Sequence, residues 1–98
     1  MEKKTPHCKL AQIKALLATD KVRTTQAARE GAAALGFDFD GMLNVVMHLS
    51  SADFYKSMTT HANHRIWQDV YRSNTAVGVV YLKLTVIDDV LIVSLKEL

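Results

Sequence analysis

The sequence predicts an α+β fold in which N-terminal helices pack on one face of a C-terminal antiparallel β-sheet. Apolar residues recur at helical spacing in the first half, and β-branched and aromatic runs separated by turn residues fill the second half. Helices followed by strands, rather than alternating with them, are typical of this class. The 98 residues, 49% of them apolar, indicate a single domain spanning 1–98.

The first helix is expected close to the start of the chain. Thr5-Pro6 is a helix-start pattern, because a hydroxyl caps the first turn and proline is favoured at the first helical position. A helix is therefore expected over 6–18, with an apolar stripe of Leu10, Ile13, Leu16 and Leu17. Val22-Arg23 follows as a short extended link.

An alanine-rich helix comes next. Thr24 or Thr25 is expected to cap it, and Gly36 is a natural C-terminal stop. Asp40 is expected to cap a third helix, whose predicted buried stripe comprises Met42, Leu43, Val46 and Met47. The segment 50–53, a serine followed three residues later by an acid, predicts a short capping pattern or a turn.

The residues from Phe54 onwards favour strands. Two runs form a hairpin around a histidine-containing loop, and Ser73-Asn74-Thr75 is expected as the next turn. A long strand then leads through a two-residue turn, Asp88-Asp89, into the last strand. The expected strands span 54–60, 66–72, 77–87 and 90–97.

Side-chain alternation predicts the register of the last hairpin. A two-residue turn places Ile87 opposite Val90, and counting outward every apolar residue then meets an apolar one. The expected core-facing residues are Val80, Leu82, Leu84, Val86, Leu91, Val93 and Leu95. The same register places Tyr81 opposite Lys96 on the other face, with Lys83 one pair along.

The face that carries Tyr81 and Lys96 has two interpretations. An antiparallel sheet commonly exposes one polar face to solvent, where a tyrosine–lysine pair contributes packing and solubility. The same groups suit phosphate chemistry, because lysine supplies a cation and three hydrogen-bond donors. Tyrosine adds a group that donates a hydrogen bond, stacks on a base or transfers a proton.

The first hairpin offers two further candidates for that face. Lys56 lies in its first strand and Gln68 in its second. A three-residue loop would place Lys56 opposite Gln68, whereas a four-residue loop would place them on opposite faces, and the sequence does not choose. Trp67 alternates with Gln68 and is expected in the core, with base stacking as the alternative.

Charge and composition exclude several classes of protein. The net charge is only +2, and the basic excess in residues 1–30 favours a solvated helix face over a nucleic-acid surface. The sequence has no apolar run of ~20 residues to span a membrane and no signal peptide, so a cytoplasmic location is expected. The lone Cys8 is expected to be an incidental thiol of the first helix. The four histidines have unrelated spacings, so no metal or other cofactor is expected.

Several stretches of the sequence resemble the MqsR (motility quorum-sensing regulator) toxin family. The stretches that carry the resemblance are DFDGM (38–42), DFYKSMTT (53–60), IWQDVYR (66–72), VYLK (80–83) and VLIVS (90–94), with Lys96. The opening residues 2–7 and the link 22–25 fit as well. The resemblance covers essentially the whole chain.

The resemblance implies a RelE-like fold and the toxin of a type II toxin–antitoxin system. It implies a metal-independent endoribonuclease that cleaves messenger RNA at short GC-containing triplets and thereby inhibits translation and growth. It also implies a partner antitoxin that carries zinc and a DNA-binding domain. The functional residues of the family correspond here to Lys56, Gln68, Tyr81 and Lys96. Candidate RNA-binding residues beside them are Tyr55, Arg72 and Lys83.

Two other classes of function stay open on the sequence. A non-catalytic RNA- or protein-binding module would use the same face and would retain RNA without cleaving it. An interaction protein would use a sheet edge or a helix and would bind no RNA. The predicted Tyr81–Lys96 pair, together with the family match at Lys56 and Gln68, favours the ribonuclease.

Overall fold

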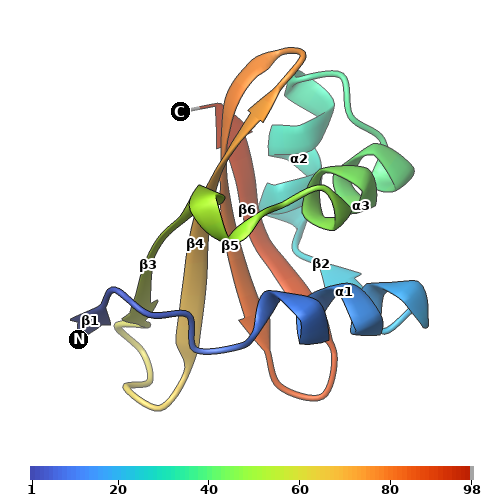
Figure 1. Cartoon of the computed structure of the whole chain (residues 1–98). Coiled ribbons are helices and arrows are strands. Elements are labelled where there is room, and N and C mark those ends of the chain that lie inside the picture. The colour runs from blue at the N-terminus through green and yellow to red at the C-terminus, as the bar shows by residue number, and fades with distance from the viewer. Residues whose placement is uncertain (98) are drawn as a thin grey trace.

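A computed structural model describes residues 1–97 of the chain and confirms the α+β class. The helices lie together on one side of a six-stranded sheet (Figure 1). They are α1 (Leu10–Ala18), α2 (Gln26–Ala34) and α3 (Phe39–Met47), followed by a 3-10 turn, η1 (Ser51–Asp53). None of the helices in this part of the chain is long and apolar enough to cross a membrane.

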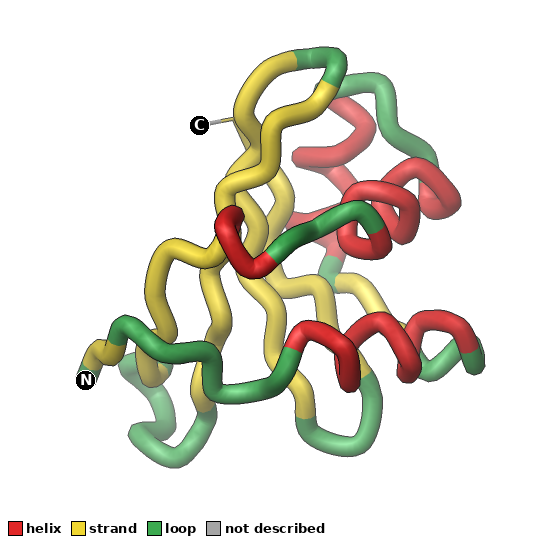
Figure 2. The backbone as a smooth tube through the Cα atoms, in the orientation of Figure 1, coloured by secondary structure: helices red, strands yellow, loops and turns green. Residues whose placement is uncertain are grey.

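The sheet has the spatial order β1-β3-β4-β5-β6-β2. Its strands are β1 (Glu2–Lys3), β2 (Val22–Thr24), β3 (Phe54–Thr59), β4 (Trp67–Thr75), β5 (Gly78–Val86) and β6 (Val90–Glu97). All neighbouring strands are antiparallel except β2, which runs parallel to β6. The tube in Figure 2 shows how β1 and β2, absent from the sequence prediction as strands, extend the sheet at its two edges.

The prediction that the first helix begins at residue 6 is wrong, because α1 begins at Leu10. The buried carboxylate of Asp69 in β4 accepts hydrogen bonds from the backbone N–H groups of His7 and Cys8, at 2.9 and 3.0 Å. It also accepts one from Ser57 Oγ at 2.6 Å. Asp69 therefore holds the segment before α1 in a non-helical conformation against the sheet.

The caps of the other helices are partly as predicted. Thr25 caps α2, because its side chain accepts a hydrogen bond from the backbone N–H of Ala28, and Gly36 follows α2 with φ +85°. Asp38, rather than Asp40, caps α3 by accepting from the N–H of Gly41 at 2.8 Å. Asp40 instead lies in the first turn, where an acid suits the helix dipole.

The predicted stripe of α3 is half correct. Its buried residues are Met42, Val45 and Val46, whereas Leu43 is half-buried and Met47 is 40% exposed. The capping box predicted at the next turn is confirmed, because the carboxylate of Asp53 accepts a hydrogen bond from the backbone N–H of Ser50 at 2.8 Å. This turn leads directly into β3.

The turn predicted at 73–75 is wrong. These residues continue β4, with Ser73 paired to Val80 and Thr75 to Gly78. The chain reverses directly after Thr75, at Ala76-Val77, and the next residue, Gly78, has φ +109°. Ser-Asn-Thr is a common turn composition, but here it completes the β4–β5 ladder, which runs without a register shift.

The last hairpin departs from prediction near its tip. Val86 pairs with Val90, so the turn has three residues, 87–89, and Val93 is then an extra residue in β6. The core-facing residues of β6 are consequently Val90, Ile92 and Leu95 instead of the predicted Leu91, Val93 and Leu95. Beyond the bulge the predicted register returns.

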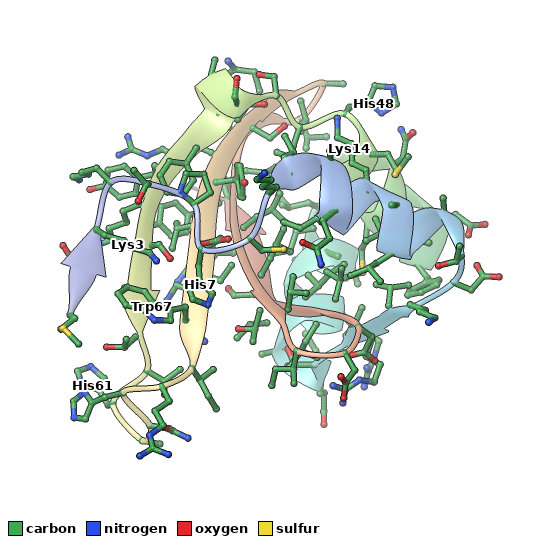
Figure 3. The ribbon with its side chains drawn as sticks, turned by 60° about the horizontal axis from the view of Figure 1, so that its bottom comes forward. Lys3, His7, Lys14, His48, His61 and Trp67 are labelled. Carbon is green, nitrogen blue, oxygen red and sulfur yellow. The ribbon has the colours of Figure 1, made fainter. Side chains whose placement is uncertain are left out.

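The hydrophobic core lies between the helices and the sheet. Its largest fully buried side chains are Ile13, Met42, Val46, Leu49, Tyr71, Val80, Leu82, Leu84, Val90, Ile92 and Leu95. Trp67, which was expected in the core, is not among them. It is half-buried and stacks on His7 with the ring centroids 5.5 Å apart, while Lys3 Nζ lies 4.2 Å from its ring centroid (Figure 3).

Tyr71 brings a polar atom into this core. Its hydroxyl is buried and has no hydrogen-bond partner within residues 1–97, and burial raises its pKa to about 12. Because an unpaired buried hydroxyl adds a desolvation cost, Tyr71→Phe is expected to leave the free energy of unfolding unchanged or to raise it by up to about 1 kcal/mol. Urea denaturation measures this difference, and a clear loss of stability in the variant would contradict the expectation.

Candidate active site

The strand register gathers the predicted site residues on the face of β3–β6 opposite the helices, which we call the open face. Cross-strand partners project from the same side of a sheet, and so do residues two apart in one strand. Tyr81 pairs with Arg72 on one side and with Lys96 on the other. Lys83 lies two residues from Tyr81 and therefore shares this face.

The predicted pairing of Tyr81 with Lys96 is confirmed. The two side chains line a shallow pocket of about 480 Å³ together with Lys83 and Glu97. The Lys96 side chain is exposed, and Tyr81 is half-buried. The pocket thus brings a phenol and two ammonium groups together at the surface of the sheet.

The first hairpin adds Lys56 and Gln68 to the same face. Lys56 pairs with Val70 and Gln68 pairs with Met58. Lys56 and Gln68 are therefore not directly opposite each other but offset by two residues along the strands. The backbone N–H of Thr60 donates to the carbonyl of Ile66, which leaves a five-residue loop, 61–65. This odd loop length is the condition under which both side chains reach one face.

Tyr55 joins the open face through a β-bulge. The register shifts between Phe54, opposite Tyr71, and Lys56, so Tyr55 has no partner in β4. Its ring lies 3.6 Å from the guanidinium carbon of Arg72, and its centroid is 6.3 Å from that of Tyr81 in an edge-to-face arrangement. Tyr55 and Arg72 thereby form a stacked aromatic–cation platform beside the Tyr81 pocket.

Lys56 carries an ion pair that the sequence did not predict. Its Nζ donates to Oε1 of Glu2 at 2.7 Å. This hydrogen bond, together with the negative charge of Glu2, raises the pKa of Lys56 and lowers that of Glu2. Lys56 is therefore suited to be a permanent cation and is unsuited to be a general base near neutral pH.

Gln68 lies farthest from the pocket. It is four residues from Arg72 along β4, which corresponds to roughly 13 Å at the usual strand rise. Its half-buried side chain shares the sheet face with Met58. The open face is thus elongated, with Gln68 near one end and the Tyr81 pocket towards the other.

Other reactive residues lie away from this face. Cys8 precedes α1 instead of lying within it, and burial raises the pKa of its thiol, so it is not an activated nucleophile. His7 stacks with Trp67 on the helix side, and His61 lies in the hairpin loop (Figure 3). Within residues 1–97 no three His, Cys, Asp or Glu side chains are grouped to hold a metal ion.

Two acidic residues of the site were missed by sequence reasoning. Glu2 reaches the open face because β1 pairs with β3, and a two-residue strand has no periodicity by which to recognise it. Glu97 lines the Tyr81 pocket from the end of β6. Strand alternation pairs Glu97 with the core-facing Val80, so no sequence pattern indicated its place in the pocket.

The arrangement suits the recognition of a single-stranded polyanion. The exposed cations Arg72 and Lys96, the half-buried Lys83 and the paired Lys56 supply charge to phosphate groups. The Tyr55–Arg72 platform offers a surface on which a nucleobase can stack. A tyrosine beside a lysine in an open pocket places a proton donor next to a fixed positive charge.

Comparison with known proteins agrees with this description. Residues 5–97 match the family described as "Motility quorum-sensing regulator, toxin of MqsA". The chain is 61% identical over 97 residues to the mRNA interferase toxin MqsR of Escherichia coli (strain K12), and the match covers 99% of each protein. The chain therefore belongs to the MqsR toxin family.

Proposed function

We propose that this chain is a toxin that acts as an endoribonuclease on messenger RNA, with its active site on the open face. The Tyr81–Lys96 pair, in a pocket shared with Lys83, is the observation that carries the assignment of the site. The activity is supported by the 61% identity to an mRNA interferase toxin. A non-catalytic binding module would need the same phosphate-binding cations but would not need a proton donor beside them.

Metal-independent cleavage of RNA has three chemical requirements. The 2′-oxygen of the ribose attacks phosphorus while the bond to the 5′-oxygen breaks, which gives a 2′,3′-cyclic phosphate and a 5′-hydroxyl end. A base removes the proton of the 2′-hydroxyl, and an acid protonates the departing 5′-oxygen. Fixed cations and hydrogen-bond donors stabilise the additional negative charge on the phosphate.

The side chains of the open face match these requirements. Lys56 and Lys96 supply positive charge to the phosphate, and Tyr81 donates a hydrogen bond or transfers a proton. Gln68 hydrogen-bonds the RNA at the other end of the face. Tyr55, Arg72 and Lys83 bind the flanking nucleotides by stacking and by charge.

The family relationship supports three further proposals. The substrate is messenger RNA carrying short GC-containing triplets, and its cleavage inhibits translation and growth. A cognate antitoxin that binds zinc and DNA neutralises the toxin. The protein acts in the cytoplasm, where both of these partners are found.

The proposal is tested by incubating a defined messenger RNA with the purified protein in the presence of EDTA. We expect cleavage at discrete positions with cyclic phosphate ends, and on the order of 10²-fold slower cleavage by Lys56→Ala and Tyr81→Ala. RNA that is retained but stays intact would identify a binding module instead. Full activity in both variants, with folding intact, would contradict the site assignment.

A further inference from the structure

The N-terminal strand places a carboxylate on the open face. In β1, Glu2 pairs with Met58 and Lys3 pairs with Ser57 of β3. Met58 lies two residues from Lys56, so Glu2 shares the face that carries Lys56. Lys3 projects to the helix side, where its Nζ lies 4.2 Å from the ring centroid of Trp67.

Glu2 takes one of the donors of Lys56. Its Oε1 accepts a hydrogen bond from Lys56 Nζ at 2.7 Å, the short distance typical of a charge-assisted bond. The Lys56 side chain is 20% exposed and that of Glu2 is 56% exposed, so the pair remains open to an incoming anion. The structure shows two ion pairs within residues 1–97, and the other, Arg23–Asp89, joins β2 to the last turn.

Contacts on both sides of Glu2 hold it in this position. The backbone N–H of Thr59 donates to the carbonyl of Met1 at 3.0 Å, and Asp69 accepts the N–H groups of His7 and Cys8. Figure 3 shows Lys3 and His7, which belong to the same N-terminal segment, lying over Trp67 on the helix side of the sheet. The strand that carries Glu2 is thus attached to the sheet independently of the Lys56 contact.

A carboxylate and a phosphodiester compete for the same ammonium group. Both present anionic oxygens that accept charge-assisted hydrogen bonds from lysine. Because the Glu2 carboxylate is largely open to solvent, its ion pair contributes little net free energy, and a phosphate held by the rest of the open face can replace it. The free protein therefore presents Lys56 already neutralised.

We propose that Glu2 is an internal competitor for RNA, whose carboxylate occupies Lys56 until a substrate phosphate displaces it. This inference rests on the proposed function, in which Lys56 binds the phosphate of the RNA. In this proposal Glu2 lowers the affinity of the protein for every RNA whose phosphate binds Lys56.

The proposal is tested by the binding of a mixed-sequence 2′-O-methyl RNA oligonucleotide, which lacks the nucleophile for cleavage, over a series of salt concentrations. Glu2→Gln keeps a hydrogen-bonding side chain and removes the charge. We expect about two- to fivefold tighter binding. Because Lys56 then adds one net phosphate contact, the slope of log K against log salt should steepen by about 0.7.

Two comparisons separate this effect from a general change in charge. Glu30→Gln removes the same charge from the exposed side of α2, and it should alter neither affinity nor salt slope. In a Lys56→Gln background, Glu2→Gln should no longer tighten binding. Equal tightening in both backgrounds, or no tightening by Glu2→Gln in the natural chain, would overturn the proposal.

The same data separate a failure of this inference from a failure of the proposed function. If Lys56→Gln weakens binding of the oligonucleotide but Glu2→Gln does not strengthen it, only the competitor role is wrong. If Lys56→Gln leaves both RNA binding and RNA cleavage unchanged, the assignment of Lys56 to the active site is wrong as well.

Discussion

Replacing Lys96 with alanine is expected to lower kcat/KM for RNA cleavage by about 10²- to 10³-fold. Lys96 lies directly opposite Tyr81 in the pocket of the open face, and it forms no ion pair with any residue in 1–97. Its charge is therefore not shared with a paired carboxylate of the described residues, whereas that of Lys56 is shared with Glu2. Cleavage kinetics on a short defined RNA measure the loss.

Three controls make this expectation specific. Lys96 is exposed, so Lys96→Ala should not change the urea midpoint of unfolding. Lys21→Ala removes another exposed lysine, which lines a different pocket beside the 87–89 turn, and the variant should cleave RNA normally. Lys96→Arg keeps the charge and should recover part of the activity. Activity of Lys96→Ala within a factor of two of the natural chain would exclude the assigned role.

The central pair of the site was predictable from the sequence, although part of the reasoning was wrong. The predicted two-residue turn of the last hairpin is a three-residue turn, which shifts the register by one. The bulge at Val93 shifts it back, so Tyr81 still pairs with Lys96. Apolar residues on both faces of β6 concealed the error, because either register aligns apolar partners.

The rest of the site depends on features without a sequence signal. Tyr55 contacts Arg72 because β3 contains a β-bulge of one extra residue. The alternation of side chains in that strand does not predict the bulge. Glu2 reaches Lys56 through a two-residue strand at the sheet edge. The segment that follows this strand is held by Asp69, which accepts hydrogen bonds from the backbone N–H groups of Cys8 and His7, 61 and 62 residues away in the chain. Contacts of this range are set by the assembled fold, and local pattern does not contain them.

The close packing of α2 against β6 gives the second large expectation, because Gly31 lies where these two elements meet. A Cβ atom added at Gly31 would lie 2.0 Å from the carbonyl oxygen of Leu95 and 3.8 Å from the Cα of Lys96. Helix propensity alone predicts that Gly31→Ala stabilises the protein by ~1 kcal/mol. The clash with strand backbone reverses the sign, and we expect a loss of about 3 kcal/mol in the free energy of unfolding.

Gly31→Ala should also slow RNA cleavage, because β6 can relieve the clash only by moving the backbone that carries Lys96. A displacement of about 1 Å at a catalytic group costs up to 10²-fold in rate, so the folded fraction of Gly31→Ala should cleave RNA at least about tenfold more slowly. Gly36→Ala is the matched control: its φ of +85° makes alanine strained, but no atom lies within 4 Å of the added Cβ. It should cost about 1 kcal/mol and leave the activity of the folded protein intact.

Urea denaturation followed by Trp67 fluorescence, with cleavage assayed on the folded protein, distinguishes the two variants. A Gly31→Ala protein as stable as the natural chain would show that α2 and β6 separate easily, and that Lys96 does not depend on their contact.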